Sequence, residues 1–196
     1  MPATKPIVLA SASPRRREIL TTAGIPFVVK IANVAEEVIS GETPRDYVLR
    51  LASRKAQAVD DGADEVILAA DTVVVLGNEI LEKPVDTDDA KRMLGLLSGR
   101  EHVVMTGVCL RWGSEQRTAV ESTKVRFARL SDEEIADYVA SGEPMDKAGA
   151  YAIQGLASKF IERVEGCYFN VVGLPISLIY GWLVRASWSG GSDGNP

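Results

Sequence analysis

Short apolar, strand-like runs alternate along this chain with helix-like segments, and this alternation constrains the fold more than any other feature. An order of this kind is typical of an α/β protein. The chain has 196 residues, a length that fits one domain. We therefore expect a single domain over residues 1–188 and a flexible polar tail over 189–196, which has little to bury.

Cap and turn residues predict the individual elements. The predicted strands cover residues 7–10, 26–31, 65–70, 72–76, 101–112, 115–127, 160–165 and 168–172. The predicted helices begin at Pro14, with Ser13 as N-cap, at Pro44, at Asp86, at the capping box of Ser131 and Glu134, and at Pro175. The two longest strands should form a hairpin around Gly113.

Composition excludes several kinds of protein. The 22 basic and 27 acidic residues give a net charge of −5, which disfavours nucleic-acid binding because a duplex needs a large basic footprint. No apolar run reaches the roughly 18 residues of a membrane helix, and two cysteines fit a reducing, cytoplasmic compartment. Because His102 is the one histidine, a two-histidine zinc site is excluded. A bound metal would have carboxylate and water ligands, which suit magnesium or manganese.

Three arginines follow Ser13 and Pro14 in the first turn of a predicted helix, where the positive end of the helix dipole makes each cation unfavourable. The pattern makes sense if main-chain N–H groups, the Ser11 and Ser13 hydroxyls and the arginine guanidinium groups bind one anion together. The alternative, that these arginines simply extend into water, stays open. If they bind phosphates, Arg16→Ala should weaken substrate use and leave stability unchanged or slightly improved.

Asp71 stands between two apolar runs, at the predicted end of a strand. A carboxylate there is costly to bury without a cation, and it can meet a metal or a substrate. The alternative is a turn aspartate bonded to the neighbouring main chain. Glu36 and Glu37 lie in a loop and could supply further oxygen ligands, whereas Lys55 and Lys83 would ordinarily be surface lysines.

The segment from Asp146 to Gly155 places small residues around Tyr151 and Gln154, which indicates close approach of the main chain to a flat ligand. The Gln154 amide can offer a donor and an acceptor to the edge of a base. The alternative is a turn packed under the sheet. His102 and the two cysteines are interpreted as structural residues.

Together these residues fall into sequence blocks that resemble a known family. The blocks are LASASPRRREIL at 9–20, AADTVV at 69–74, KP at 83–84, SGxxHxVxTG at 98–107, and GEPxDKAGAYAIQG at 142–155 followed by NVVGLP at 170–175. In this order they resemble the Maf family of nucleotide pyrophosphatases. The resemblance implies an α/β fold with a mixed, elongated sheet flanked by helices and a deep central cleft, similar to inosine triphosphate pyrophosphatases.

The resemblance also implies an activity and a set of residues. The activity would be cleavage of a nucleoside triphosphate between the α and β phosphates, with a divalent metal, Mg or Mn, as cofactor. Asp71 would be the catalytic acid, and Asp71 and Glu36 would bind the metal. The substrate-binding residues would be Ser13, Arg15, Arg16, Glu36, Lys55, Thr72, Lys83 and Gln154.

Arg15, Thr72 and Gln154 occupy positions that separate branches of the family, and here they resemble the dTTP/UTP branch. The expected function is therefore house-cleaning hydrolysis of dTTP, UTP and modified pyrimidine nucleotides to the monophosphate and pyrophosphate. Two alternatives stay open: a pyrophosphatase for 7-methyl-GTP or another modified nucleotide, and a non-catalytic regulator of septum formation. The resemblance is consistent with a cytoplasmic homodimer that has no nucleic-acid or membrane partner.

Overall fold

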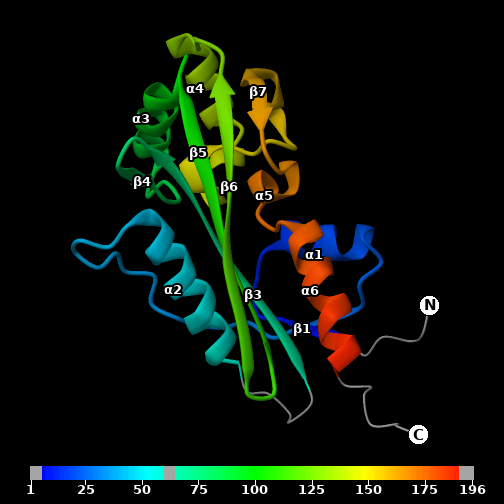
Figure 1. The fold of residues 1–196 in the computed structure, drawn as a ribbon. Helices are drawn as coiled ribbons and strands as arrows, with labels where there is room; N and C mark the ends of the chain where they lie inside the picture. The colour runs from blue at the N-terminus through cyan, green and yellow to red at the C-terminus, as the bar shows by residue number, and fades with distance from the viewer. Residues whose placement is uncertain (1–5, 60–64, 190–196) are drawn as a thin grey trace, which may run out of the picture.

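The computed structural model describes residues 6–59 and 65–189, and it confirms the expected α/β fold around a mixed sheet (Figure 1). The strands are β1 (Ile7–Leu9), β2 (Phe27–Val29), β3 (Val66–Leu76), β4 (Glu79–Leu81), β5 (Glu101–Trp112), β6 (Glu115–Phe127) and β7 (Ile161–Glu165). Their order in the sheet is β2-β1-β3-β5-β6-β7, and β4 pairs with β3. β1 is parallel to both of its neighbours, whereas the other pairs are antiparallel.

All the α-helices except α5 begin at, or one residue after, the positions that the cap residues predict. They are α1 (Pro14–Thr22), α2 (Pro44–Gln57), α3 (Thr87–Leu97), α4 (Asp132–Ala140), α5 (Tyr168–Val172) and α6 (Ile176–Ser189), with short 3₁₀ turns η1 (Glu143–Asp146), η2 (Ala148–Ala150) and η3 (Leu156–Phe160). Side-chain oxygens of Ser13, Thr43, Asp86 and Ser131 accept the N-terminal N–H bonds of α1, α2, α3 and α4. Ser189 ends α6, and the remaining tail residues lie outside the described part of the chain.

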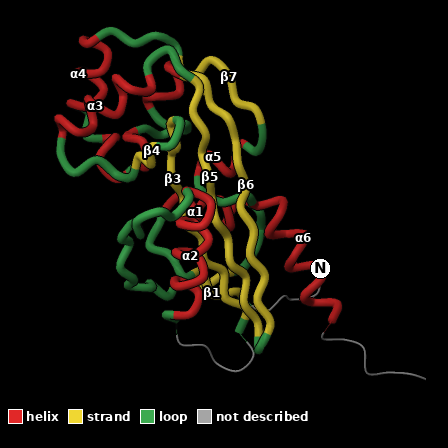
Figure 2. Tube along the Cα trace, turned by 60° about the vertical axis from the view of Figure 1, so that its left-hand side comes forward, coloured by secondary structure: helices red, strands yellow, loops and turns green. Residues whose placement is uncertain are grey.

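β3, β5 and β6 run along the length of the molecule, with α3 and α4 beside one end and α2, β1 and α6 in the opposite half (Figures 1 and 2). β3 is buried on both faces, and its residues alternate between two cores. Ile67 and Ala69 pack on the side covered by α2, while Leu68 and Ala70 pack with α1 and α6. Asp71 and Thr72 therefore project from opposite faces of the same strand.

The sheet has a gap beside β3. β1 pairs with β3 at Ile67 and Leu68, and β4 pairs with it from Val74 onward. On that side, no described strand lies next to the residues between these two pairings. The gap positions the cleft described below.

The structure corrects two sequence expectations. Asp71 does not lie at the carboxyl end of a strand, because β3 continues without interruption to Leu76 through its pairing with β5. Residues 168–172 form the short helix α5 instead of a strand. Asn170 and Val172 are buried, the Asn170 amide donates to Val104 O of β5 and Thr123 Oγ1 of β6, and the turn closes at Gly173 with a positive φ of 122°.

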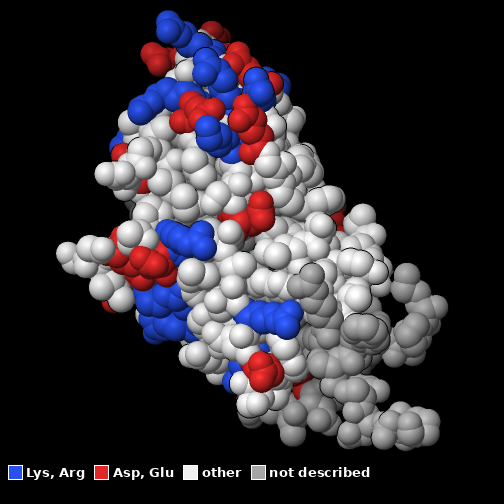
Figure 3. All heavy atoms as spheres, in the orientation of Figure 1, with Lys and Arg blue, Asp and Glu red and all other residues white. Residues whose placement is uncertain are grey.

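Two observations concern the surface of the protein: the charge on one face, and whether any helix could span a membrane. On the face drawn in Figure 3, Lys and Arg alternate with Asp and Glu at the end that carries α4. Among the residues that the structure describes, no helix combines the length and the apolar character needed to cross a membrane.

Candidate active site

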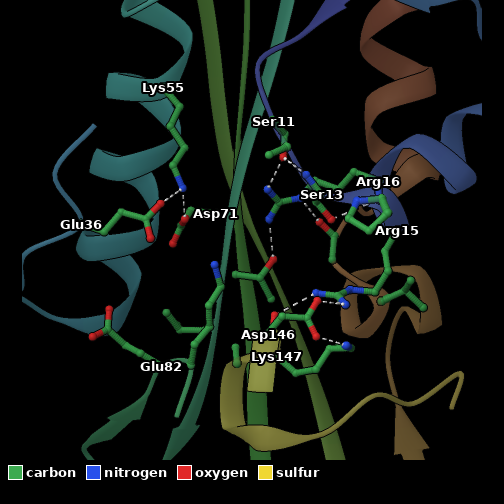
Figure 4. Close-up of a pocket in the computed structure, with 18 of the residues that line it drawn as sticks. Ser11, Ser13, Arg15, Arg16, Glu36, Lys55, Asp71, Glu82, Asp146 and Lys147 are labelled. Atoms are coloured by element: carbon green, nitrogen blue, oxygen red, sulfur yellow. Dashed lines mark hydrogen bonds and ion pairs between the residues drawn. The ribbon is translucent and has the colours of Figure 1, made fainter. Parts of the chain in front are cut away.

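A cleft of about 870 Å³ opens at the gap in the sheet and is lined by α1, β3, the loop after β2, and the segment from η1 to Gln154 (Figure 4). Every residue that the sequence predicts for the site lies in this one cleft. These residues are Ser13, Arg15, Arg16, Glu36, Lys55, Asp71, Thr72, Lys83 and Gln154. Residues more than 130 positions apart in the sequence thus meet at the free edge of β3.

On the α2 face of β3, one lysine holds two carboxylates. The Lys55 Nζ lies 2.6 Å from Asp71 Oδ1 and 2.5 Å from Glu36 Oε1, and the Lys55 and Asp71 side chains are each 11% exposed. Burial raises the pKa of Asp71, partly offset by the charge of Lys55. Burial also acts to raise the pKa of Glu36, but the hydrogen bond and charge of Lys55 outweigh it and lower the pKa below its ordinary value. Glu36, rather than Glu37, is the loop glutamate that faces the cleft.

On the opposite face, Arg16 is buried and bonded to its own chain. Its Nε donates to Gly173 O at 2.8 Å, one terminal nitrogen donates to Ala70 O at 2.8 Å and to Ser11 Oγ, and the other donates to Thr72 Oγ1 at 3.1 Å. A guanidinium has five N–H donors, so these bonds leave one N–H for a ligand. Burial lowers the pKa of Arg16, and the nearby Asp71 charge opposes this.

The environment of Arg16 argues against one expectation from the sequence. Because its removal would leave buried carbonyl groups without donors, Arg16→Ala is expected to destabilise the protein instead of relieving a dipole mismatch. Sequence reasoning missed this because the partners of Arg16 are main-chain carbonyls that fold next to it from Ala70 and Gly173. Arg16 contributes a fixed positive charge beside Asp71 more than a free guanidinium fork.

Arg15 is placed differently, although it is the neighbouring residue. Its guanidinium contacts Asp146 across the cleft, at 3.2 Å to Oδ2 and 3.3 Å to the main-chain O. The other carboxylate oxygen of Asp146 accepts a hydrogen bond from Lys147 Nζ, which also donates to Glu143 O. Burial acts to raise the pKa of Asp146, but Lys147 and Arg15 together outweigh this and lower the pKa below its ordinary value. The Asp146 carboxylate thus lies between two cations that line the cleft.

Of the four remaining predicted residues, Ser13 and Thr72 form hydrogen bonds with Arg16, and Lys83 and Gln154 line the cleft beside them. Ser13 caps α1, since its Oγ accepts from Arg16 N at 3.4 Å. The Thr72 hydroxyl bonds to Arg16 and, at 2.9 Å, to Thr106. Lys83 and Gln154 line the cleft and are exposed, so both are accessible to a ligand.

Two further groups support the site and were not predicted. The Tyr47 hydroxyl donates to Glu82, and both residues line the cleft. His102 is buried, and its Nε2 lies 2.8 Å from the hydroxyl of Tyr151, another lining residue. Burial lowers the pKa of His102 to about 4, which favours the neutral ring, and its buried position agrees with its interpretation as a structural histidine. Glu82 stands next to Lys83 in the sequence, but nothing in the local pattern indicates its tyrosine partner.

The donor set fits a divalent cation only in part. Asp71 and Glu36 meet at Lys55 Nζ, so two carboxylates could face one ion. Within residues 6–59 and 65–189, no group of three or more His, Cys, Asp or Glu side chains is gathered as a ligand set. Magnesium is commonly held by one or two carboxylates together with substrate phosphates and waters, and this pair fits that arrangement.

The fold and the cleft define a class of protein: an α/β protein with a gap in its sheet, where a buried acid and several cations converge on space for a polyanionic ligand. The sequence model of the family described as Maf-like protein matches residues 6–186. The chain belongs to this family.

Single proteins similar to this chain are consistent with the family assignment. The chain is 53% identical over 186 residues to the dTTP/UTP pyrophosphatase of Anaeromyxobacter dehalogenans (strain 2CP-C), covering 93% of this chain and 94% of the relative. It is 47% identical over 185 residues to the dTTP/UTP pyrophosphatase of Geobacillus sp. (strain WCH70), covering 94% and 100%. The structure of the Staphylococcus aureus Ham1 protein matches with a TM-score of 0.53 at 16% identity, over 93% of this chain and 100% of that one, which shows a common fold.

Proposed function

We propose that this protein hydrolyses dTTP and UTP to the monophosphate and pyrophosphate. The observation that carries the proposal is the buried Asp71 carboxylate, 2.6 Å from Lys55 Nζ, in the same cleft as Arg15, Arg16 and Lys83. Curated relatives about half identical over more than nine tenths of the chain carry the name of this activity. An acid surrounded by cations suits attack on a triphosphate, where negative charge must be neutralised as the leaving group departs.

The reaction needs one water molecule and breaks one P–O bond of the triphosphate. Asp71 orients the water and accepts its proton as a new bond forms from the water oxygen to the α-phosphorus. The bond from the α-phosphorus to the α–β bridging oxygen breaks, and pyrophosphate leaves with the electron pair. Lys55, Lys83 and the one unbonded N–H of Arg16 would stabilise charge on the phosphates, and all three residues line the cleft.

A divalent cation, Mg or Mn, would be held by Asp71 and Glu36. When bound, it would supply further neutralisation of phosphate charge. Lys55 contacts both carboxylates, and it therefore keeps the two acids together when no cation lies between them.

Selection of the base involves Gln154, whose side chain lines the cleft. Thymine and uracil present the O4 acceptor beside the N3–H donor, and the Gln154 amide N–H can donate to one of the two lone pairs of O4. Cytosine reverses this pattern, so its binding would leave polar groups unpaired at a cost of about 1–3 kcal/mol, or roughly 5- to 150-fold. dCTP and dATP, whose bases present an amino group beside a ring-nitrogen lone pair, should therefore be poor substrates. Guanine has the same acceptor and donor pattern as uracil, so the expectation that dGTP is a poor substrate rests on the names of the relatives.

A panel of nucleotides tests the proposal. We expect kcat/KM for dTTP and UTP to exceed the values for dCTP, dATP, dGTP and 7-methyl-GTP, with pyrophosphate as product. The Gln154→Ala variant should narrow the gap between dTTP and dCTP while its melting temperature stays unchanged. Preference of the unmodified protein for 7-methyl-GTP, or no turnover of any nucleotide, would refute the proposal.

A further inference from the structure

The gap beside β3 leaves main-chain groups of that strand without a neighbouring strand. β1 pairs only as far as Leu68, and β4 begins to pair at Val74. An unpaired strand edge presents N–H and C=O groups that can bond to whatever lies next to it. Here the edge borders the cleft, because Asp71, Thr72 and Val73 are among the lining residues.

The pairing pattern shows which residues direct these groups into the gap. Trp112 and Glu115 pair across the two-residue turn of the β5–β6 hairpin, so even-numbered residues of β5 bond to β6 and odd-numbered ones bond to β3. Gly107, an odd-numbered residue, is paired with Asp71. The main chain of Asp71 therefore faces β5, and that of Thr72 faces the gap.

Two observed hydrogen bonds agree with this direction. Leu68 O accepts from Ala10 N at 2.8 Å, and Ala70 O accepts from Arg16 at 2.8 Å, both on the side away from β5. Thr72 is the next residue in this alternating series. Since Arg16 already occupies the carbonyl of Ala70, the N–H and C=O of Thr72 are the adjacent donor and acceptor that the edge offers to a ligand.

The side chain of Thr72 is committed elsewhere. Its Oγ1 accepts from Arg16 and lies 2.9 Å from the hydroxyl of the buried Thr106. The Thr106 hydroxyl donates its hydrogen to Asn170 O, so the hydrogen between the two threonines comes from Thr72. Thr72 therefore has no hydroxyl hydrogen to donate to a ligand.

We propose that the main-chain N–H and C=O of Thr72 form a nucleobase subsite that reads the O4 and N3–H edge of a 4-keto pyrimidine. The N–H donates to O4, and the C=O accepts from N3–H, as one extended residue bonds to its partner in an antiparallel sheet. The subsite rests on the proposed function and deepens it, because it names the groups that recognise the base.

This arrangement accounts for a preference that excludes cytosine and accepts both thymine and uracil. In cytosine the N4 amino group would face the Thr72 N–H and the N3 lone pair would face the C=O, so both contacts would be repulsive. The 5-methyl group, which distinguishes thymine from uracil, is not part of the O4 and N3 edge. Reading by main-chain groups also fixes the base one residue away from Asp71 along a strand paired to β5.

Hydrogen exchange of single amides tests the subsite in the unmodified, full-length protein. The probe is α,β-methylene-dTTP, which cannot be cleaved at the α–β position, and the comparison ligand is α,β-methylene-dCTP. We expect saturation with the thymidine analogue to slow exchange of the Thr72 amide by about tenfold or more, and the cytidine analogue to leave it unchanged. The Asp71 amide, which bonds to β5, serves as the internal control and should stay protected throughout.

A matched pair of variants separates the main chain from the side chain. Thr72→Pro removes the N–H without breaking the pairing with β5, because this N–H faces the gap. Thr72→Val keeps both main-chain groups and loses the hydroxyl. We expect the dTTP-to-dCTP ratio of kcat/KM to fall about tenfold in Thr72→Pro and to stay within about twofold in Thr72→Val, even if both variants lose activity.

The outcomes also separate this inference from the proposed function. If the unmodified enzyme does not cleave dTTP, the proposed function is wrong. If it cleaves dTTP and binds the thymidine analogue, but the Thr72 amide exchanges as fast as in the free protein, only the subsite is wrong. An equal change of the ratio in Thr72→Val and Thr72→Pro would also overturn it, because the side chain would then be the reader. If Thr72→Pro does not fold, the exchange experiment still decides.

Discussion

The two faces of β3 differ at the cleft, although Asp71 and Thr72 are adjacent in the chain. On the α2 face, Lys55 holds Asp71 and Glu36, and the Glu36 side chain is 46% exposed. On the other face, Arg16 is buried and donates to Ser11, Ala70, Thr72 and Gly173 of its own chain. On the first face, the charged side chains pair with one another. On the second face, four of the five N–H groups of Arg16 already donate to atoms of the protein.

The difference indicates that the Asp71 face suits a role in catalysis and that the Arg16 face suits a role in stabilising the fold. A carboxylate held by a lysine can exchange that partner for a water, a cation or a phosphate without breaking the main-chain structure. A guanidinium bonded to buried carbonyls cannot, because each lost donor leaves an acceptor unsatisfied. Substitutions on the Asp71 face should therefore change rate, and substitutions on the Arg16 face should change stability.

The largest effect is expected for Asp71→Asn. Removal of a general base typically lowers the rate by roughly 10²–10⁴-fold, and the amide has nearly the shape of the carboxylate. We expect kcat for dTTP to fall within that range while circular dichroism and the melting transition show a folded protein. Glu37→Gln is the control, because Glu37 is exposed beside Glu36 and does not line the cleft. A folded Asp71→Asn protein with near-normal turnover would contradict the role of Asp71.

Arg16→Ala tests the supporting face. It leaves Ala70 O and Gly173 O without their guanidinium donors, and each unsatisfied buried acceptor costs about 1–3 kcal/mol. We expect the free energy of unfolding to fall by about 3 kcal/mol, measured by urea denaturation without ligand. Arg17→Ala, an exposed neighbour in the same helical turn, should change it by less than about 0.5 kcal/mol. Equal stability of the two variants would show that Arg16 does not support the fold.

A third prediction concerns His102, whose side chain lies on the same face of the sheet as Thr106 and therefore on the Arg16 face. It is tested by the pH dependence of stability. Burial lowers the pKa of His102 to about 4, below its ordinary value of about 6.5, so the folded state favours the neutral ring. Its contribution is complete above about pH 6.5 and is lost as pH falls to about 4, by up to about 3 kcal/mol. We expect the free energy of unfolding, measured by urea denaturation, to fall less between pH 7 and 4 in His102→Gln than in the unmodified protein. Identical slopes would contradict the burial of a neutral histidine.

Local patterns predicted most of the fold. The N-cap of α1, the start of α2 at Pro44, the capping box of α4 and the β5–β6 hairpin depend on residues close together in the sequence, and all are confirmed. The continuity of β3 could not be predicted at Asp71. The strand is continued there by pairing with β5, a contact between distant residues, while Lys55 from α2 neutralises the carboxylate.

The site was predicted as a set of residues but not as a geometry. Charge and motif placed Arg15 and Arg16 together, yet one contacts Asp146 across the cleft and the other is buried against carbonyls. Main-chain acceptors carry no sequence signature, so no pattern around Arg16 could indicate its partners. The same reason hid the Thr72 main chain, whose direction follows from the pairing of β5 with β6.

The smallest effect is expected for Asp146→Asn, which tests whether Arg15 behaves like the charges of the Asp71 face. Arg15 and Asp146 are 26% and 61% exposed, so solvent screens their pairing and its loss should change stability by at most about 1 kcal/mol. The substitution removes a negative charge that lies between Arg15 and Lys147 and would repel a triphosphate. We expect KM for dTTP to fall about two- to fivefold at low ionic strength, and the difference to shrink at high salt because mobile ions screen exposed charges. Asp132→Asn, an exposed acid at the start of α4 outside the cleft, is the control and should leave KM unchanged. A higher KM in Asp146→Asn would mean that Asp146 orients Arg15 for the substrate, and that Arg15 depends on its protein partner as Arg16 does.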